Sequence, residues 1–412
     1  MKKVPRLRFR GFSEDWELCK LGQVANYRRG SFPQPYGNKE WYDGENSMPF
    51  VQVVDVGDNL RLVEDTKQKI SELAQPKSVF VKEGKVVVTL QGSIGRVAIT
   101  QYPAYVDRTL LIFESYKAEM DEYYFAYVIQ QLFEYEKTRA PGGTIKTVTK
   151  EALSDFTISF PSIEEQKKLG KFFEQLDDTI TLHQRKLDQL KKLKKAYLQA
   201  MFVSTNPKNN KVPKLRFTDF EGDWELCKLG VMAPLRGGFA FKSENFQNSG
   251  VRIVRISNID KMGKIRGPYV YCQEQENDTN YLLPNNSVLL AMSGATTGKV
   301  AILSKRSKEK YYQNQRVGYF QKNIEYSYDF IAVLVQSDLF LKQLDSVLVS
   351  GAQPNISSTE INNFNFMIPK NVEEQNQIGI FIKNIDNTIT FHQNKLTQLK
   401  SLKKSYLQNM FI

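Results

Sequence analysis

One loop of this sequence resembles a phosphate-binding loop. Residues 292–299 (MSGATTGK) are rich in small side chains and end in a lysine. A Walker loop needs four residues between its glycines and a Ser or Thr after the lysine, where it binds magnesium. Here only three residues separate Gly294 from Gly298, and Val300 follows the lysine. The loop therefore does not predict nucleotide hydrolysis.

A second group of residues could suggest a metal-dependent nuclease. Asp58 and residues 65–67 (DTK) supply acids and a lysine, but the second half of the chain has no counterpart. The sequence has no Asn/Asp-Pro-Pro-aromatic methyltransferase motif and no Cys-x-x-Cys metal pair. Its only histidines, His183 and His392, lie in long helical patterns, so no loop histidine can act as a general base. These patterns predict binding without catalysis, and no metal site.

Basic and amide residues with nearby aromatics form three loop clusters at matching places in the two halves of the chain. Arg and Lys can hold phosphates, Arg can pair with guanine edges, and Gln and Asn with adenine edges. For each charged residue, a solvated surface position without function is the alternative interpretation. The predicted DNA contacts are Arg28, Arg29, Lys39, Trp41, Tyr42, Gln91, Ser93, Arg96, Lys146 and Thr147 in the first half, and Arg236, Phe239, Lys242, Ser293, Thr296, Thr297, Lys299, Gln353 and Asn355 in the second.

Composition favours a polyanionic partner. The 412 residues include 57 Lys+Arg and 45 Asp+Glu, which gives a net charge of +12, and the 41% hydrophobic content suffices for ordinary cores. Three cysteines cannot form a disulfide framework. The opening residues MKKVPRLRFRGF lack the apolar core of a signal peptide, and no apolar run could span a bilayer. We expect a cytoplasmic protein that binds nucleic acid and no membrane.

The elements that would position these loops are two copies of a long helix. Residues 163–202 and 372–411 align without a gap, and about 24 of 40 positions are identical. Each copy opens with the pattern of a helix N-terminus, in which Glu165 or Glu374 would return to the cap. At 1.5 Å per residue each helix would be roughly 60 Å long.

Seven-residue spacing in both copies predicts the seam of a coiled coil. His183 and His392 occupy equivalent seam positions, where a polar residue that fixes the helix register is favoured over a metal or acid-base site. The predicted seam residues are Leu169, Phe173, Leu176, Ile180, His183, Leu187, Leu190, Tyr197 and Met201 in the first helix, and Ile378, Ile382, Ile385, Ile389, His392, Leu396, Leu399, Tyr406 and Met410 in the second.

The whole chain is a tandem duplication. Residues 4–22 return as residues 212–230, with Trp16 and Trp224 in equivalent places. Because both copies keep the tryptophan, we expect it to pack the opening segment onto its own domain; an aromatic contact with a base is the alternative. Between opener and helix, each half has four strand-like runs and then a helix, at about residues 122–137 and 329–347.

This order predicts two tandem α+β domains, related by an approximate twofold axis and joined by two long helices. The expected divisions are residues 1–161 for the first domain, 162–202 for the first helix, 203–211 for a linker, 212–370 for the second domain and 371–412 for the second helix. Nine linker residues reach at most about 30 Å. The second domain runs directly into the second helix. If that domain is compact, the end of the first helix lies near the start of the second, so we expect an antiparallel coiled coil.

In this arrangement the chain resembles the specificity subunit of type I restriction-modification systems. The resemblance covers the full chain and is carried by the VP(R/K)LRF…DWELCKLG openers, the two diverged regions and the EEQ-to-YLQ(A/N)MF helices. It implies two target-recognition domains that read the halves of a split site in double-stranded DNA, with helices that space them and bind two modification (methyltransferase) subunits.

The resemblance also implies that this chain is a non-catalytic targeting subunit without a cofactor of its own. S-adenosylmethionine, ATP and Mg²⁺ would be used by the modification subunits and by the restriction (ATP-dependent translocase and nuclease) subunits. One alternative is a coiled-coil scaffold that does not bind DNA, which leaves the loop clusters and the net charge unexplained. A fused nuclease or methyltransferase is another, and the missing motifs argue against it.

Overall fold

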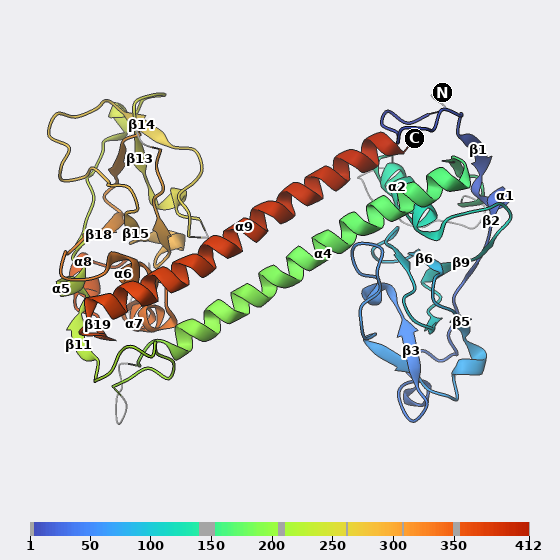
Figure 1. Ribbon diagram of the computed structural model, residues 1–412, viewed down its shortest axis with the longest axis horizontal. Coiled ribbons are helices and arrows are strands. Elements are labelled where there is room, and N and C mark those ends of the chain that lie inside the picture. Colours follow the sequence, from blue (N-terminus) through green and yellow to red (C-terminus); the bar gives the residue numbers. More distant parts are fainter. Residues whose placement is uncertain are drawn as a thin grey trace. The chain divides into compact units, whose positions relative to one another are not determined.

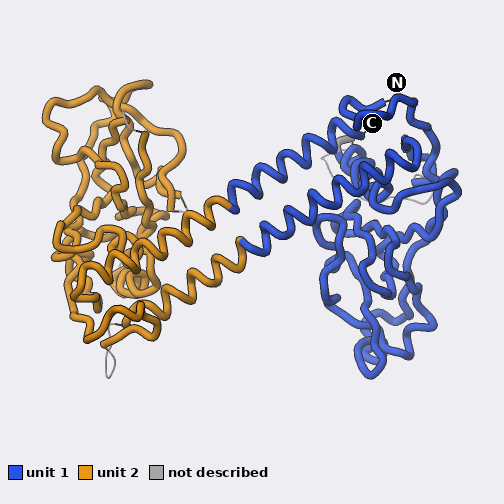
Figure 2. Tube along the Cα trace, viewed as in Figure 1, with its two compact units in different colours: residues 1–186, 392–412 blue, residues 187–391 orange. Residues whose placement is uncertain are grey.

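The computed structural model describes residues 4–139, 153–204, 211–260, 263–306, 309–348 and 355–411. It divides into two compact units, Met1–Lys186 with His392–Ile412, and Leu187–Phe391 (Figure 2). Each unit contains one globular domain and part of each long helix. Helix α4 spans Ile163–Ala200 and helix α9 spans Val372–Met410 (Figure 1).

The two helices run antiparallel within each unit, as the short linker and the chain connectivity predicted. In each unit, residues later in α4 meet residues earlier in α9. In the first unit the contacts join Phe172 with Tyr406, Asp177 with Lys403, and His183 with His392. In the second unit they join Lys194 with Asp386 and Tyr197 with Phe381.

The first domain contains two four-stranded sheets. One has the order β2–β9–β6–β7 and the other β4–β3–β8–β5, in which only the β3–β8 pair is parallel. Helix α2, Glu122–Arg139, shares its core with the first sheet and with the ends of α4 and α9 that belong to this unit. The strands are β2 Ala25–Arg29, β3 Met48–Val51, β4 Gln68–Ile70, β5 Val79–Val81, β6 Val86–Thr89, β7 Val97–Ile99, β8 Ala104–Val106 and β9 Leu110–Tyr116.

The second domain repeats this framework with sheets β12–β18–β15–β16 and β14–β13–β17. The helix predicted at 329–347 is two helices, α6 Tyr328–Leu334 and α7 Asp338–Leu348. Ser337 interrupts it, because its hydroxyl donates to the Leu334 carbonyl over 2.7 Å and accepts from the Phe340 amide over 3.4 Å. The strands are β12 Leu235–Arg236, β13 Val251–Val254, β14 Val270–Cys272, β15 Val288–Ala291, β16 Val300–Ile302, β17 Tyr311–Gln313 and β18 Val317–Phe320.

The repeated openers fasten each domain to its long helix. Strand β1, Glu17–Lys20, pairs with β10, Thr157–Phe160, and β11, Glu225–Lys228, pairs with β19, Asn365–Ile368, in the same register. Trp16 and Trp224 are buried in the cores, which confirms their scaffold role.

The glutamates at the starts of the long helices bind arginines of the openers. Arg8 and Arg216 form two-bond ion pairs with Glu165 and Glu374, respectively, with distances of 2.7 to 2.8 Å. We expected these carboxylates to cap their own helices. They are instead directed at the openers, where they tie the two ends of each domain together.

Candidate nucleic-acid interface

The loops that follow β6 and β15 have the same backbone frame in the two domains. Thr89 N–H donates to the Arg96 carbonyl, and Ala291 N–H to the Lys299 carbonyl, each over 2.9 Å. Small residues recur in both loops. The structure gives a packing reason for two of them, because a Cβ on Gly95 would lie 2.6 Å from Phe133 Cβ and a Cβ on Gly298 would lie 2.3 Å from Leu344 Cδ2.

Each of these loops lies against a 3-10 helix that follows β3 or β13. A Cβ on Gly92 would lie 3.6 Å from Val53, the first residue of η2 (Val53–Asp55). A Cβ on Gly294 would lie 3.5 Å from Ile256, the first residue of η6 (Ile256–Asn258).

The residue before each 3-10 helix is held in the same way in both domains. The backbone N–H of Gln52 donates to Asp55 Oδ2 over 2.8 Å, and the backbone N–H of Arg255 donates to Asn258 Oδ1 over 2.9 Å.

A turn in each domain, between β8 and β9 in the first and between β17 and β18 in the second, bonds to the strand that precedes the 3-10 helix. Asp107 N–H donates to the Val51 carbonyl over 3.0 Å, and Asn314 N–H to the Val254 carbonyl over 3.1 Å. We name the three segments together the loop junction. It comprises residues 52–55, 91–96 and 107–109 in the first domain, and residues 255–258, 293–299 and 314–316 in the second.

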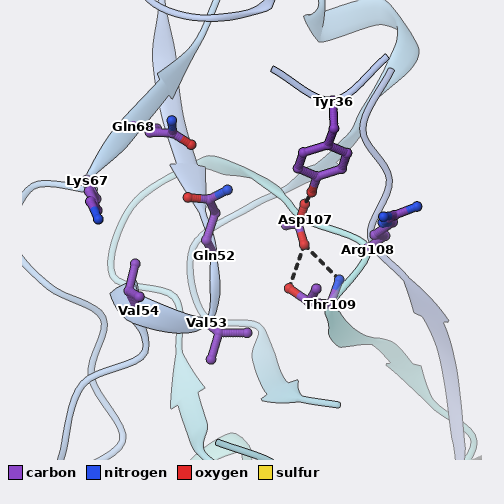
Figure 3. A pocket seen from close by; sticks show the side chains of 9 residues that line it. All are labelled: Tyr36, Gln52, Val53, Val54, Lys67, Gln68, Asp107, Arg108 and Thr109. Carbon is purple, nitrogen blue, oxygen red and sulfur yellow. Dashed lines mark hydrogen bonds between the residues drawn. The ribbon is translucent and has the colours of Figure 1, made fainter. Parts of the chain in front are cut away.

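The loop junction of the first domain borders a pocket of about 400 Å³ (Figure 3). Tyr36 donates its hydroxyl proton to Asp107 Oδ2, while Thr109 N–H and Oγ1 bond to Asp107 Oδ1 over 2.9 and 2.5 Å. The Arg108 guanidinium lies 4.9 Å from the centre of the Tyr36 ring. The pocket is lined by Tyr36, Gln52, Val53, Val54, Lys67, Gln68, Asp107, Arg108 and Thr109.

None of these residues was among the predicted DNA contacts, although Lys67 belongs to the acid-lysine group that the sequence did not support as a nuclease site. The signal was present in the strand registers, which align Phe50 with Ile253 because these residues face Gln68 and Val270, respectively. Counting two residues onward shows that Gln52 and Arg255 occupy equivalent positions in the two domains. This alignment becomes visible only once the strand partners are known.

The predicted contacts of the first domain lie in different environments. Arg28 and Arg29 are exposed on β2, and Arg28 is 3.7 Å from Glu114. Lys39 is exposed, at the start of η1, Lys39–Trp41. Trp41 is only 8% exposed and belongs to a buried cluster.

Trp41 therefore corrects the prediction that placed its ring on the surface. Its cluster includes Phe32 and Phe50, and packing among these rings removes the apolar surface of the indole from water. Tyr42 is half-buried and stacks on Phe32 with 5.2 Å between ring centres. Gln91, Ser93 and Arg96 are exposed in the loop junction.

Arg236 of the second domain is also a correction. Its Nε and Nη2 donate to Gln313 Oε1 over 3.1 and 2.9 Å, and Nη1 and Nη2 donate to the carbonyls of Thr279 and Leu282. Burial lowers the pKa of Arg236. The guanidinium is thus held by internal acceptors and braces β12 against β17.

The other predicted residues of the second domain are more accessible. Phe239 is 49% exposed, and exposed Lys242 lies 3.6 Å from Glu244. Thr296, Thr297 and Lys299 are half-buried in the loop junction.

The structure brings two predicted clusters of the second domain together. Ser293 forms a β-bridge with Asn355, and Asn355 Oδ1 accepts from Arg316 Nη1 over 3.3 Å. Lys146, Thr147 and Gln353 lie outside the described residues.

A larger groove of about 1360 Å³ in the first unit is lined by residues of both its domain and the long helices. Arg96 faces this groove and not the smaller pocket, and Asp58 also lines it. Among the described residues, no group of three or more His, Cys, Asp and Glu side chains could hold a metal ion. The groove also carries Arg61, Lys137, Arg185, Lys400 and Lys403.

The two histidines contact one another across the helix pair. His183 Nδ1 and His392 Nδ1 are 2.8 Å apart, and both rings are half-buried. Burial, followed by the charges of His183 and Lys186, lowers the pKa of His392. A hydrogen bond between two Nδ1 atoms needs one donor and one acceptor, so at least one ring must be neutral.

In the part of the chain that the structure describes, no helix is long and apolar enough to cross a membrane.

Comparison with known proteins gives consistent matches. The profile of a family described as type I restriction modification DNA specificity domain matches residues 13–192 and again residues 221–401. The specificity subunit of the type I restriction enzyme MjaVIII of Methanocaldococcus jannaschii is 25% identical over 401 residues, which cover 96% of this chain and 91% of that protein. The EcoprrI specificity subunit of Escherichia coli is 21% identical over 411 residues, covering 95% and 92%.

The fold is also found in a solved structure. The S subunit of a type I restriction-modification system from M. genitalium superposes with a TM-score of 0.68 at 14% sequence identity, covering 99% of both chains.

Proposed function

This chain belongs to the family of type I restriction modification DNA specificity domains and is a specificity subunit with two target-recognition domains; we propose that each domain reads one half of a split sequence in double-stranded DNA. One observation carries the proposal. The loop junctions share their backbone bonds, yet Gln52 is replaced by Arg255, and Asp107, Arg108 and Thr109 by Asn314, Gln315 and Arg316. Two readers of different sequences need this combination of constant frame and variable side chains.

The net charge of +12 supports binding to a polyanion. On the groove of the first unit, Arg185 and Lys400 supplement the side chains of the loop junctions, whereas Arg61, Lys137 and Lys403 are paired with Asp178, Glu134 and Asp177. In this proposal Arg96 and Lys299 contact phosphates and position the protein, while residues nearer the pocket distinguish bases.

The long helices would also bind two copies of a modification subunit. Apolar side chains outside the seam occur at equivalent places in both repeats: Leu182 and Phe391 are 68% and 61% exposed, and Leu193 and Leu402 are both 44% exposed. In each unit one such residue lies on α4 and one on α9: Leu182 and Leu402 in the first unit, Leu193 and Phe391 in the second. A face that occurs twice supports two copies of the same partner.

Catalysis would be supplied by those partners. The modification subunits would transfer the methyl group of S-adenosylmethionine, and restriction subunits that use ATP and Mg²⁺ would translocate and cleave DNA. This chain would contribute only the choice of the sequence, in the cytoplasm.

The proposal is tested by reconstituting the chain with its modification subunits and measuring methylation of random DNA. We expect methyl groups at a split motif with two defined halves. A helix scaffold that does not bind DNA predicts methylation without a motif, or none.

The docking face has its own test. Leu182→Glu and Phe391→Glu should each weaken one of two equivalent sites, so native mass spectrometry should record complexes with one modification subunit. The control Gln175→Glu changes an exposed residue of α4 outside this pair. Two subunits bound to both variants with unchanged affinity would refute the assignment of this face.

A further inference from the structure

Position 52 in the first domain and position 255 in the second differ from the rest of the loop junction. Their backbone is fixed in the same way, because both N–H groups bond to the side chain three residues later. Both side chains are half-buried and neither is apolar. A polar side chain on a rigid backbone, partly shielded from water, is well placed to discriminate between ligands.

The Gln52 side chain lines the pocket of Figure 3 beside Gln68 and Asp107. Asp107 is buried and its two carboxylate oxygens already accept bonds from Tyr36 and Thr109. It therefore acts as a positioning residue that holds the wall of the pocket. The Gln52 amide has one donor and one acceptor group side by side, the pattern that pairs with N7 and N6 of adenine.

Arg255 carries the corresponding observation in the second domain. Its Nε atom is buried and has no hydrogen-bond partner among the residues that the structure describes. A buried donor without a partner is costly, by about 1–3 kcal/mol, so the side chain loses no internal bond of Nε when it turns to present this group to an acceptor on a ligand. Guanine offers O6 and N7 as two acceptors, which match the fork of an arginine.

The residues around positions 52 and 255 also differ between the two domains. By strand register, the equivalents of Lys67 and Gln68 in the second domain are Tyr269 and Val270. The wall formed by Asp107 and Thr109 is replaced by Asn314 and Arg316. The shared frame thus presents two different sets of hydrogen-bonding groups.

We propose that Gln52 and Arg255 are base-reading residues of their domains, Gln52 for an adenine in one half-site and Arg255 for a guanine in the other. This assignment rests on the proposed function and adds the residues and base types to it. Arg108, exposed above the Tyr36 ring, and Lys67 flank Gln52 and provide positive charge toward the DNA backbone.

The test uses the chain assembled with its modification subunits and a library of DNA duplexes in which every position is randomised. Methylated molecules are sequenced to give the base preference at each position. Gln52→Ala should lower the preference for adenine at one base pair of one half-site by roughly 5- to 150-fold, because one bidentate contact gives that range of discrimination. Gln52→Glu, of nearly the same size, should shift the preference there toward cytosine, whose N4 donates to a carboxylate.

Arg255→Ala should remove a preference for guanine in the other half-site only. The unaltered half-site serves as the control for folding in each variant. Gln23→Glu is a matched substitution on α1, Leu21–Val24, that keeps the acceptor for the Lys20 N–H, and it should change neither half-site.

The outcomes separate the two levels of the proposal. If the wild-type complex selects no split sequence, the proposed function fails and this assignment fails with it. If the wild type selects one, while Gln52→Ala and Gln52→Glu leave every base preference unchanged or weaken all positions equally, the function stands and Gln52 is not a reader. The same criterion applies to Arg255.

Discussion

Replacing Lys403 by methionine should destabilise the first unit much more than the same change at Lys194 destabilises the second. The two lysines occupy equivalent positions in the repeat, and each forms an ion pair with an aspartate of the other helix, over 2.6 Å in both cases. The pairs differ in burial: the side chains of Lys403 and Asp177 are 13% and 4% exposed, whereas those of Lys194 and Asp386 are 22% and 39% exposed.

Burial sets the expected magnitudes. Without Lys403, Asp177 keeps one 2.5 Å bond from Tyr127 but loses its counter-ion, and a buried charge without its partner costs about 3–5 kcal/mol. Asp386 can be hydrated when Lys194 is removed, so that loss should be about 1 kcal/mol or less. Methionine keeps most of the aliphatic stem in both variants, so the comparison isolates the charge.

Urea unfolding, followed by hydrogen exchange of α2 in the first unit and of α6 and α7 in the second, measures each unit separately. The double variant Asp177→Asn/Lys403→Met should recover most of the stability, because the unpaired charge is gone. Equal losses at Lys403 and Lys194, or a loss below about 1 kcal/mol at Lys403, would contradict the argument from burial.

Three further predictions concern the loops, the domains and the histidines. Arg96→Gln and Lys299→Gln should each weaken DNA binding by the assembled enzyme and lower the slope of log affinity against log salt by about 0.9, and unchanged slopes would remove both residues from the interface. Exchanging residues 235–361 for those of a relative should alter one half of the methylated motif; changes in both halves would refute independent reading. The lowered pKa of His392 means that the unfolded chain binds more protons near pH 6.5, so stability should fall from pH 7.5 to 5.5. This fall should be smaller in His392→Gln, and equal slopes for the two proteins would count against the histidine contact.

The long helices could be predicted from the sequence because the repeat and the heptads specify them independently. Both ends were placed two residues too late, since α4 ends at Ala200 and α9 at Met410. Phe202 fits the repeat but leaves the helix. Its ring packs on Phe330 with 5.5 Å between centres, and this contact with a distant segment has no local signature.

The candidate interface was predicted less well, because residue type does not report burial. An arginine in a loop and one held by internal carbonyls are identical in sequence, which explains the error at Arg236. Trp41 shows the same difficulty for aromatics. Gln52 and Arg255, the proposed readers, were not among the predicted contacts, because the diverged regions align only through strand register.

The central claim is that the two domains read two separate halves of one DNA site. Genome-wide methylation should be sequenced in the host with and without this gene. The account predicts a methylated motif of two defined halves around an unspecified spacer, present only with the gene. A motif that persists without the gene, or a gene-dependent motif that is one uninterrupted sequence, would contradict it.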